Sequence, residues 1–168
     1  MLSKHRDQVD HIIVMGHTPI LRPVRTFSSS GMLTEKGRDS EFWRVMVKYD
    51  VDLYLCGEVH AVTCTQRDGI QQIAHGGLIG RTPKPNYLLV TVRKDRLELN
   101  LKEIDLVNGK GRLWQRDKSK GPWDTITTTP ESKKRGFTSI GSISINKKLQ
   151  LKQFDAPLGF FYENENPR

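Results

Sequence analysis

The sequence predicts a strand-rich α/β fold of the α+β kind, and three patterns indicate it. Two short apolar runs, at 9–15 and 51–56, each stop at a glycine, as buried strands do. Pairs of segments in the second half alternate apolar and polar residues around polar turns, which is typical of hairpins. One stretch near residues 40–49 repeats its apolar residues every three or four positions, which predicts a helix.

Four strands are expected in the first half of the chain. Each is a short run of apolar or β-branched residues that is bounded by glycine or by a polar turn. These strands are placed at Val9–Met15, Val51–Cys56, Ala61–Gln66 and Ile70–Ala74. The segment 67–69, Arg-Asp-Gly, supplies the turn between the last two strands.

The helix follows a loop at 22–38, which contains a proline, three consecutive serines and two glycines. Asp39 or Ser40 can cap the helix, because a short polar side chain accepts hydrogen bonds from free amides in the first turn. A single apolar stripe is expected to pack on the sheet, formed by Phe42, Val45, Met46 and Tyr49.

Two hairpins are expected in the second half. One joins Tyr87–Val92 to Leu97–Ile104, and the other joins Thr138–Ile145 to Leu149–Phe154. The intervening segment 108–136 is rich in Gly, Lys, Asp and Thr, and it is expected to be a long loop with a strand fragment.

Charge is distributed unevenly. The 168 residues contain 27 Lys and Arg against 19 Asp and Glu, which gives a net charge of +8. Most of this excess lies beyond residue 107, so we divide the chain into a unit at 1–107 and a basic, β-rich extension at 108–168 that packs on it. A basic segment can contact phosphates. The cluster at 133–135 is short, however, and lacks interleaved aromatic residues, so nucleic acid is not indicated beyond the net charge.

Several functional classes are excluded or disfavoured. No run of about 18 apolar residues is present, so no membrane-spanning helix is expected. The cysteine count, two, rules out a disulfide framework or a cysteine-based zinc site. Cys56 is expected to be a small buried residue rather than a thiolate nucleophile, because no histidine base is positioned for it.

Two strand ends carry the candidate functional residues. Gly16-His17 follows the first strand, and Gly57-Glu58-Val59-His60 follows the second. A glycine at such a junction lets the backbone turn, and the carboxyl ends of neighbouring parallel strands form a common edge where sites are built. Imidazole and carboxylate are both metal ligands. By spacing alone, a histidine after a glycine is more often a hydrogen-bonded loop residue than a metal ligand.

The order of these motifs resembles the C-terminal half of calcineurin-like metallophosphoesterases, the superfamily of purple acid phosphatases and many phosphodiesterases. The resemblance rests on IIVMGHTP at 12–19 and VDLYLCGEVH at 51–60, and it extends to the Gly-Gly turn at 76–77. It implies a β-sandwich with flanking helices and two divalent metal ions, of Mn, Fe, Zn or Mg. By motif position His17 would bind the second ion and His60 the first. Glu58 stands where the family usually has another histidine on the second ion, and a carboxylate there favours a harder ion.

The early motifs of that family, Asp-x-His, Gly-Asp-x-x-Asp and Gly-Asn-His-Asp, are absent from the sequence. They would supply the bridging aspartate and the proton donor, so the site within these residues is incomplete and no catalytic residue is assigned. We therefore expect a fragment that is inactive alone and that needs a preceding half or another chain. Its substrate would be a phosphoester. The alternative is a non-catalytic β-sandwich module that has kept the fold and binds an anionic partner.

The remaining candidates have simpler interpretations. His75 precedes the Gly-Gly turn and is expected to be structural, while His5 and His11 lie in a polar lead-in and are expected at the surface. Arginines in the loops could grip a phosphate as bidentate donors, although loop arginines are usually only solvated. They are Arg22, Arg25 and Arg81.

Overall fold

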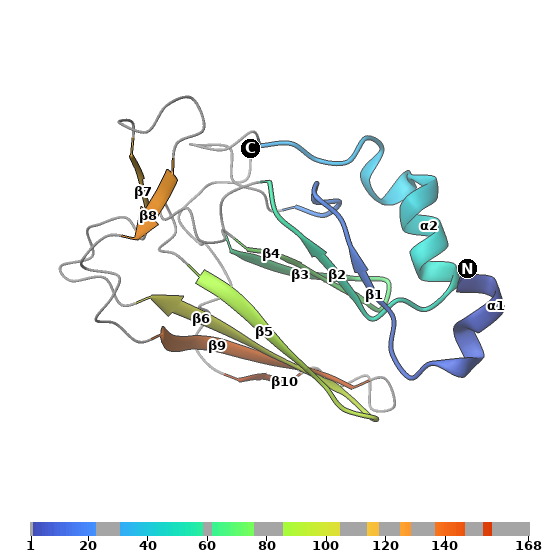
Figure 1. The fold of residues 1–168 in the computed structure, drawn as a ribbon. Helices are drawn as coiled ribbons and strands as arrows, with labels where there is room; N and C mark the ends of the chain where they lie inside the picture. The colour runs from blue at the N-terminus through green and yellow to red at the C-terminus, as the bar shows by residue number, and fades with distance from the viewer. Residues whose placement is uncertain are drawn as a thin grey trace.

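The computed structural model describes residues 2–22, 31–58, 62–75, 86–104, 114–117, 125–128, 137–146 and 153–155. Its first sheet is covered by a helix on one face and by a second sheet on the other (Figure 1). The elements are α1 Leu2–His5, η1 Arg6–Gln8, β1 Ile13–Met15, η2 Gly37–Asp39, α2 Glu41–Lys48, β2 Leu53–Cys56, β3 Thr63–Arg67, β4 Ile70–Ala74, β5 Asn86–Val92, β6 Leu97–Ile104, β7 Trp114–Asp117, β8 Thr125–Thr128, β9 Phe137–Ile145 and β10 Gln153–Asp155. The predicted mixed α/β, strand-rich fold class is confirmed.

The first sheet has the strand order β1-β2-β4-β3. β1, β2 and β4 run parallel, with Ile13 opposite Leu53, whereas β3 is antiparallel to β4. The turn between β3 and β4 is tight, because Asp68 and Gly69 both adopt a positive φ, of 50° and 82°. The parallel arrangement brings the carboxyl ends of β1, β2 and β4 to one edge, where the candidate residues lie.

The second sheet is antiparallel, with the strand order β10-β9-β6-β5. Both predicted hairpins are confirmed, since β5 pairs with β6 and β9 pairs with β10. β9 also pairs with the whole of β6, from Leu97 opposite Ile145 to Ile104 opposite Phe137. The predicted division of the chain at residue 107 stays a prediction.

Segment 108–136 contains more regular structure than expected. β7 and β8 pair with each other as an antiparallel two-stranded ribbon, where a single strand fragment was predicted. The sequence pattern missed the second strand because 125–128, Thr-Ile-Thr-Thr, lies within a stretch rich in turn-forming residues. Among the described helices, none is long and apolar enough to cross a membrane.

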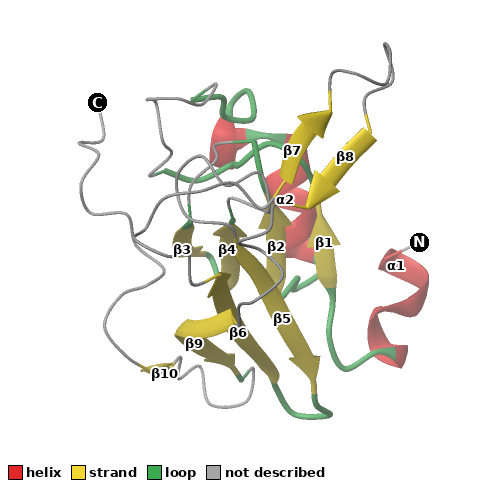
Figure 2. Cartoon of the chain, turned by 60° about the vertical axis from the view of Figure 1, so that its left-hand side comes forward, coloured by secondary structure: helices red, strands yellow, loops and turns green. Residues whose placement is uncertain are grey.

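The two faces of the first sheet contribute to different hydrophobic cores, because side chains of a strand alternate between faces. Leu53 and Ile73 point toward the second sheet and pack with Leu97, Leu99 and Leu101. Tyr54 and Cys56 point the other way, into a core shared with α2. Figure 2 shows α2 on the side of the first sheet that faces away from β5 and β6.

Helix α2 begins as predicted, and its buried face includes one residue that the prediction missed. The Ser40 hydroxyl accepts a hydrogen bond from the Trp43 amide at 3.2 Å, which caps the helix. The buried residues are Trp43 and Met46, whereas Phe42 is 42% exposed. Of the predicted stripe, Met46 is buried, Val45 and Tyr49 are half-buried, and Phe42 contacts the Tyr54 ring while staying partly exposed; the prediction missed Trp43. Its indole Nε1 donates to Asp68 Oδ2 at 2.8 Å, which fixes the rotation of the helix about its axis.

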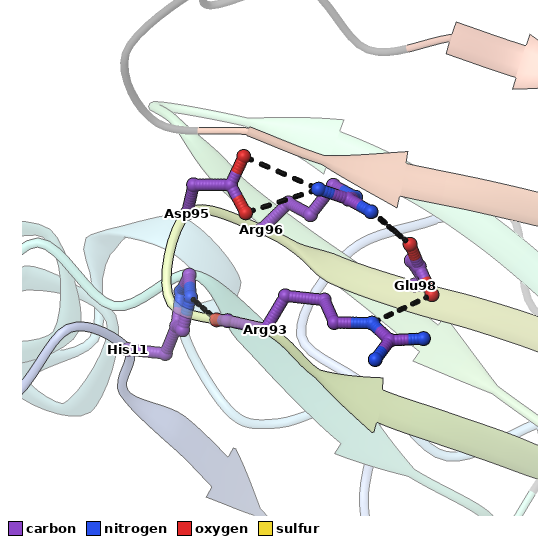
Figure 3. A network of polar contacts seen from close by, with 5 residues as sticks. All are labelled: His11, Arg93, Asp95, Arg96 and Glu98. Carbon is purple, nitrogen blue, oxygen red and sulfur yellow. Dashed lines mark hydrogen bonds and ion pairs between the residues drawn. The ribbon is translucent and has the colours of Figure 1, made fainter.

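The expectation that His11 lies at the surface is wrong. Its side chain is only 5% exposed, and its Nε2 lies 2.7 Å from the Arg93 carbonyl oxygen in the turn between β5 and β6 (Figure 3). On the other side of the ring, Nδ1 lies 3.7 Å from the buried carboxylate of Asp52. Asp52 also accepts a hydrogen bond from the Ile12 amide at 2.8 Å. The histidine is buried because it connects the first sheet to the second at the end opposite the candidate site.

Candidate metal centre at the carboxyl ends of the parallel strands

The segments that follow β1 and β2 stay paired beyond the ends of the strands. The Gly16 amide donates to the Leu55 carbonyl at 2.9 Å, and the Gly57 amide donates to the His17 carbonyl at 3.0 Å. These two bonds continue the parallel ladder by one step on each side. His17 is therefore held directly beside Gly57, and the side chain that follows Gly57 is within its reach.

His17 and Glu58 are in contact. The imidazole Nε2 meets the carboxylate Oε2, so the ring nitrogen carries the hydrogen that the carboxylate accepts. The His17 side chain is 77% exposed, whereas the Glu58 side chain is 20% exposed, so the carboxylate forms the inner part of the pair. Two predicted metal ligands from separate segments thus lie together at the sheet edge. Their role as ligands stays a prediction.

His60, the third predicted ligand, lies outside the described residues. Within the described ranges, no group of three or more His, Cys, Asp and Glu side chains is placed to hold a metal ion. His17 and Glu58 are thus two candidate ligands, and a metal site at this edge would need further donors.

The backbone at Glu58 is in the left-handed region, with a φ of 58°. For a residue with a Cβ, that conformation costs roughly 1–2 kcal/mol. Residues held in it cluster at functional sites. We predicted that the adjacent glycines provide the turns. The turn instead occurs at Glu58, and neither Gly16 nor Gly57 has a positive φ. The conformation aims the carboxylate of Glu58 back over the end of β1.

Gly16 is required for a different reason, which is the close approach of Tyr54. An added Cβ at Gly16 would meet the Tyr54 hydroxyl and would lie 2.9 Å from its ring carbon Cε2. The Tyr54 hydroxyl donates to the Thr18 carbonyl at 2.8 Å and so holds the segment that follows His17. Burial, and secondarily Cys56, raises the pKa of Tyr54 to about 12. The phenol therefore stays a hydrogen-bond donor at neutral pH.

Gln72 holds the next part of the same segment. Its buried amide oxygen accepts hydrogen bonds from the amides of Ile20 and Leu21, at 2.8 and 2.9 Å, and its Nε2 donates to the Leu21 carbonyl at 3.0 Å. Sequence reasoning did not find Gln72 or Tyr54. The sequence did contain a sign of both residues: each is a side chain with a polar group inside a segment that was predicted to be a buried strand.

The expectation that Cys56 is a small buried residue is confirmed, whereas the structural role expected for His75 stays a prediction. Cys56 is 4% exposed, and burial raises the pKa of its thiol to about 12, so it is no thiolate nucleophile at neutral pH. The His75 amide donates to the Cys56 carbonyl at 3.3 Å, which ties the end of β4 to β2. Burial lowers the pKa of the His75 imidazole, which favours its neutral form.

Comparison with known proteins finds little. No family model matches the chain, and no curated protein sequence is similar to it at a significant level. Among solved structures, Vps29 from Chaetomium thermophilum is similar, with a TM-score of 0.36 and 13% sequence identity over 73% of this chain. The matched part is 51% of the Vps29 chain, so the alignment spans about half of that protein.

Proposed function

We propose that this chain supplies part of the metal site of a metal-dependent phosphoester hydrolase. The observation that supports the proposal is the contact between His17 and Glu58, two candidate ligands that come from separate segments and meet at the carboxyl ends of parallel strands. His60, two residues after Glu58, would add a third donor.

The residues present suit a divalent ion. Imidazole nitrogen and carboxylate oxygen together are ligands for manganese, zinc and iron, and the carboxylate suits magnesium as well. In such a site the metal would activate water and neutralise charge on the phosphoryl oxygens. His17 and Glu58 would orient the ion. The Tyr54 and Gln72 hydrogen bonds would keep the His17 segment rigid, and this preorganisation matters because loosely held ligands bind metal weakly.

The general acid and the bridging ligand would have to come from another segment or another chain, because the motifs that supply them are absent from this sequence. We therefore expect the 168-residue chain alone to be inactive. Turnover of p-nitrophenyl phosphate in the presence of Mn²⁺, abolished by His17→Ala, would contradict that expectation.

The decisive experiment measures metal binding rather than activity. Metal-free chain is titrated with Mn²⁺, and the free ion is followed by electron paramagnetic resonance. His17→Ala and Glu58→Gln should each raise the dissociation constant about tenfold or more. His5→Ala is the matched control, because His5 lies on the exposed N-terminal helix and contacts Gln8. Equal Mn²⁺ binding by all of these variants would rule out the proposed site.

A non-catalytic module that binds an anionic partner is the second candidate. One observation favours it: Glu58 stands where the resemblance implies a histidine, and its carboxylate contacts the His17 imidazole directly. In that case Glu58→Gln should lower the free energy of unfolding by up to about 1 kcal/mol, and Mn²⁺ should not affect the thermal midpoint.

A further inference from the structure

A basic pocket lies at the β3 edge of the first sheet, and neither His17 nor Glu58 is among the described residues that line it. It has a volume of about 400 Å³ and lies between the segment after His17, the turn that precedes η2, and the end of β3. Its polar lining includes four cationic side chains, Arg22, Lys36, Arg38 and Arg67. No acidic residue is among the described residues that line it.

The floor of the pocket is apolar and rigid. Ile20 and Leu21 are each 4% exposed, and the buried Gln72 amide holds the backbone of both. Leu33 adds a partly buried apolar side chain at the rim. An apolar floor under a ring of cations suits an organic anion better than a bare ion, because both kinds of surface can be covered at once.

The four cations differ in their surroundings. Arg38 is fixed by a bidentate ion pair with Asp68, at 2.9 and 3.2 Å, so part of its charge is compensated. The backbone of Arg22 is held by the Thr65 hydroxyl, which donates to the Arg22 carbonyl at 3.3 Å. Lys36 and Arg67 are exposed at the rim. Even after Asp68 is counted, the pocket keeps an excess of positive charge.

We propose that this pocket binds the phosphate groups of a small organic phosphate, such as a nucleoside diphosphate. Arginine guanidinium groups bind phosphate through paired hydrogen bonds, and a volume of about 400 Å³ lies within the usual range for small-molecule sites. The contact needs no metal ion. The proposal therefore stands independently of the function proposed above.

The test is a titration with ADP and with inorganic pyrophosphate, followed by isothermal calorimetry at low ionic strength in EDTA. Lys36→Ala and Arg67→Ala should each raise the dissociation constant about fivefold, and the double variant should raise it more than tenfold. Lys94→Ala, at the exposed tip of the β5–β6 hairpin, removes the same charge and should leave binding unchanged. His17→Ala should also leave it unchanged, which separates this pocket from the metal site. Thermal unfolding of each variant confirms that it is folded.

Three results would overturn the proposal. The first is an absence of ADP and pyrophosphate binding by the unaltered chain at millimolar concentration. The second is an equal loss with Lys94→Ala, which would mean that only the net charge matters. The third is tight binding of a single-stranded oligonucleotide that pyrophosphate does not displace, which would assign these cations to a nucleic-acid surface instead.

Discussion

The phenol ring of Tyr54 occupies the space that a side chain at Gly16 would need. An added Cβ would lie 2.9 and 3.0 Å from the ring carbons Cε2 and Cζ. Gly16→Ala should therefore lower the free energy of unfolding by about 1–3 kcal/mol, because either β1 or the ring must shift. Urea denaturation measures the effect. Gly57→Ala is the control and should change stability by about 1 kcal/mol or less, since nothing lies within 4 Å of its added Cβ. Equal losses in both variants would contradict the close-approach explanation.

Gln72 should be among the most sensitive polar residues of the chain. Gln72→Leu keeps most of the side-chain volume but removes the acceptor for the Ile20 and Leu21 amides, so two buried donors lose their partner. We expect a loss of about 2–4 kcal/mol in the free energy of unfolding. Gln66→Leu, at an exposed position of β3, should lose less than about 0.5 kcal/mol. Faster hydrogen exchange at Ile20 and Leu21 in Gln72→Leu would show that the local clamp has opened.

Stability should fall in alkaline solution. Burial raises the pKa of Cys56 from 9.0 to about 12, and that of Tyr54 from 10.0 to about 12. Between pH 9 and 12 the unfolded chain releases these protons while the folded chain keeps them, so the free energy of unfolding decreases as pH rises. Urea midpoints measured under reducing conditions from pH 8 to 11 test this. In Cys56→Ala the free energy of unfolding should begin to fall nearer pH 10, because only Tyr54, whose ordinary pKa is 10.0, then contributes. A flat profile across this range would contradict the burial of both groups.

The left-handed backbone conformation that places Glu58 beside His17 should lower the stability of the folded chain. Because its φ is 58°, Glu58→Gly should be more stable than Glu58→Ala by about 1 kcal/mol, although both variants lack the carboxylate. Comparing these two variants isolates the backbone from the loss of the ion pair. Thermal unfolding measures the difference, and Mn²⁺ binding should be equally weak in both. If Glu58→Ala were as stable as Glu58→Gly, the left-handed conformation would carry no strain.

Much of the fold follows from periodicity in the sequence. The strands at 51–56 and 70–74 and both hairpins of the second sheet were predicted, because period-two alternation depends only on which faces are buried. The pairing of His17 with Glu58 at one edge also follows from two strand ends that carry polar residues, once β1 and β2 are parallel. These inferences need only local pattern and strand direction.

The rest depends on contacts between distant segments, which periodicity does not encode. His11 looks like a surface residue in a polar lead-in, but its ring lies between the Asp52 carboxylate and the Arg93 carbonyl in the turn between β5 and β6. Phe42 and Trp43 are adjacent on α2, and the partner at Asp68 decides which of them faces the core. The role of Gly16 likewise depends on Tyr54, a residue of the neighbouring strand.

The pairing of β9 with β6 has a consequence for how the chain acquires its structure. β5 and β6 are joined by a tight connection and can form a hairpin quickly, whereas β9 must wait for the segment that contains β7 and β8 to be synthesised. Until then, the backbone edge of β6 that β9 will pair with is open to other nascent chains, a condition that favours aggregation. We therefore expect yield during expression to depend on how soon β9 arrives, even for variants whose final stability is unchanged.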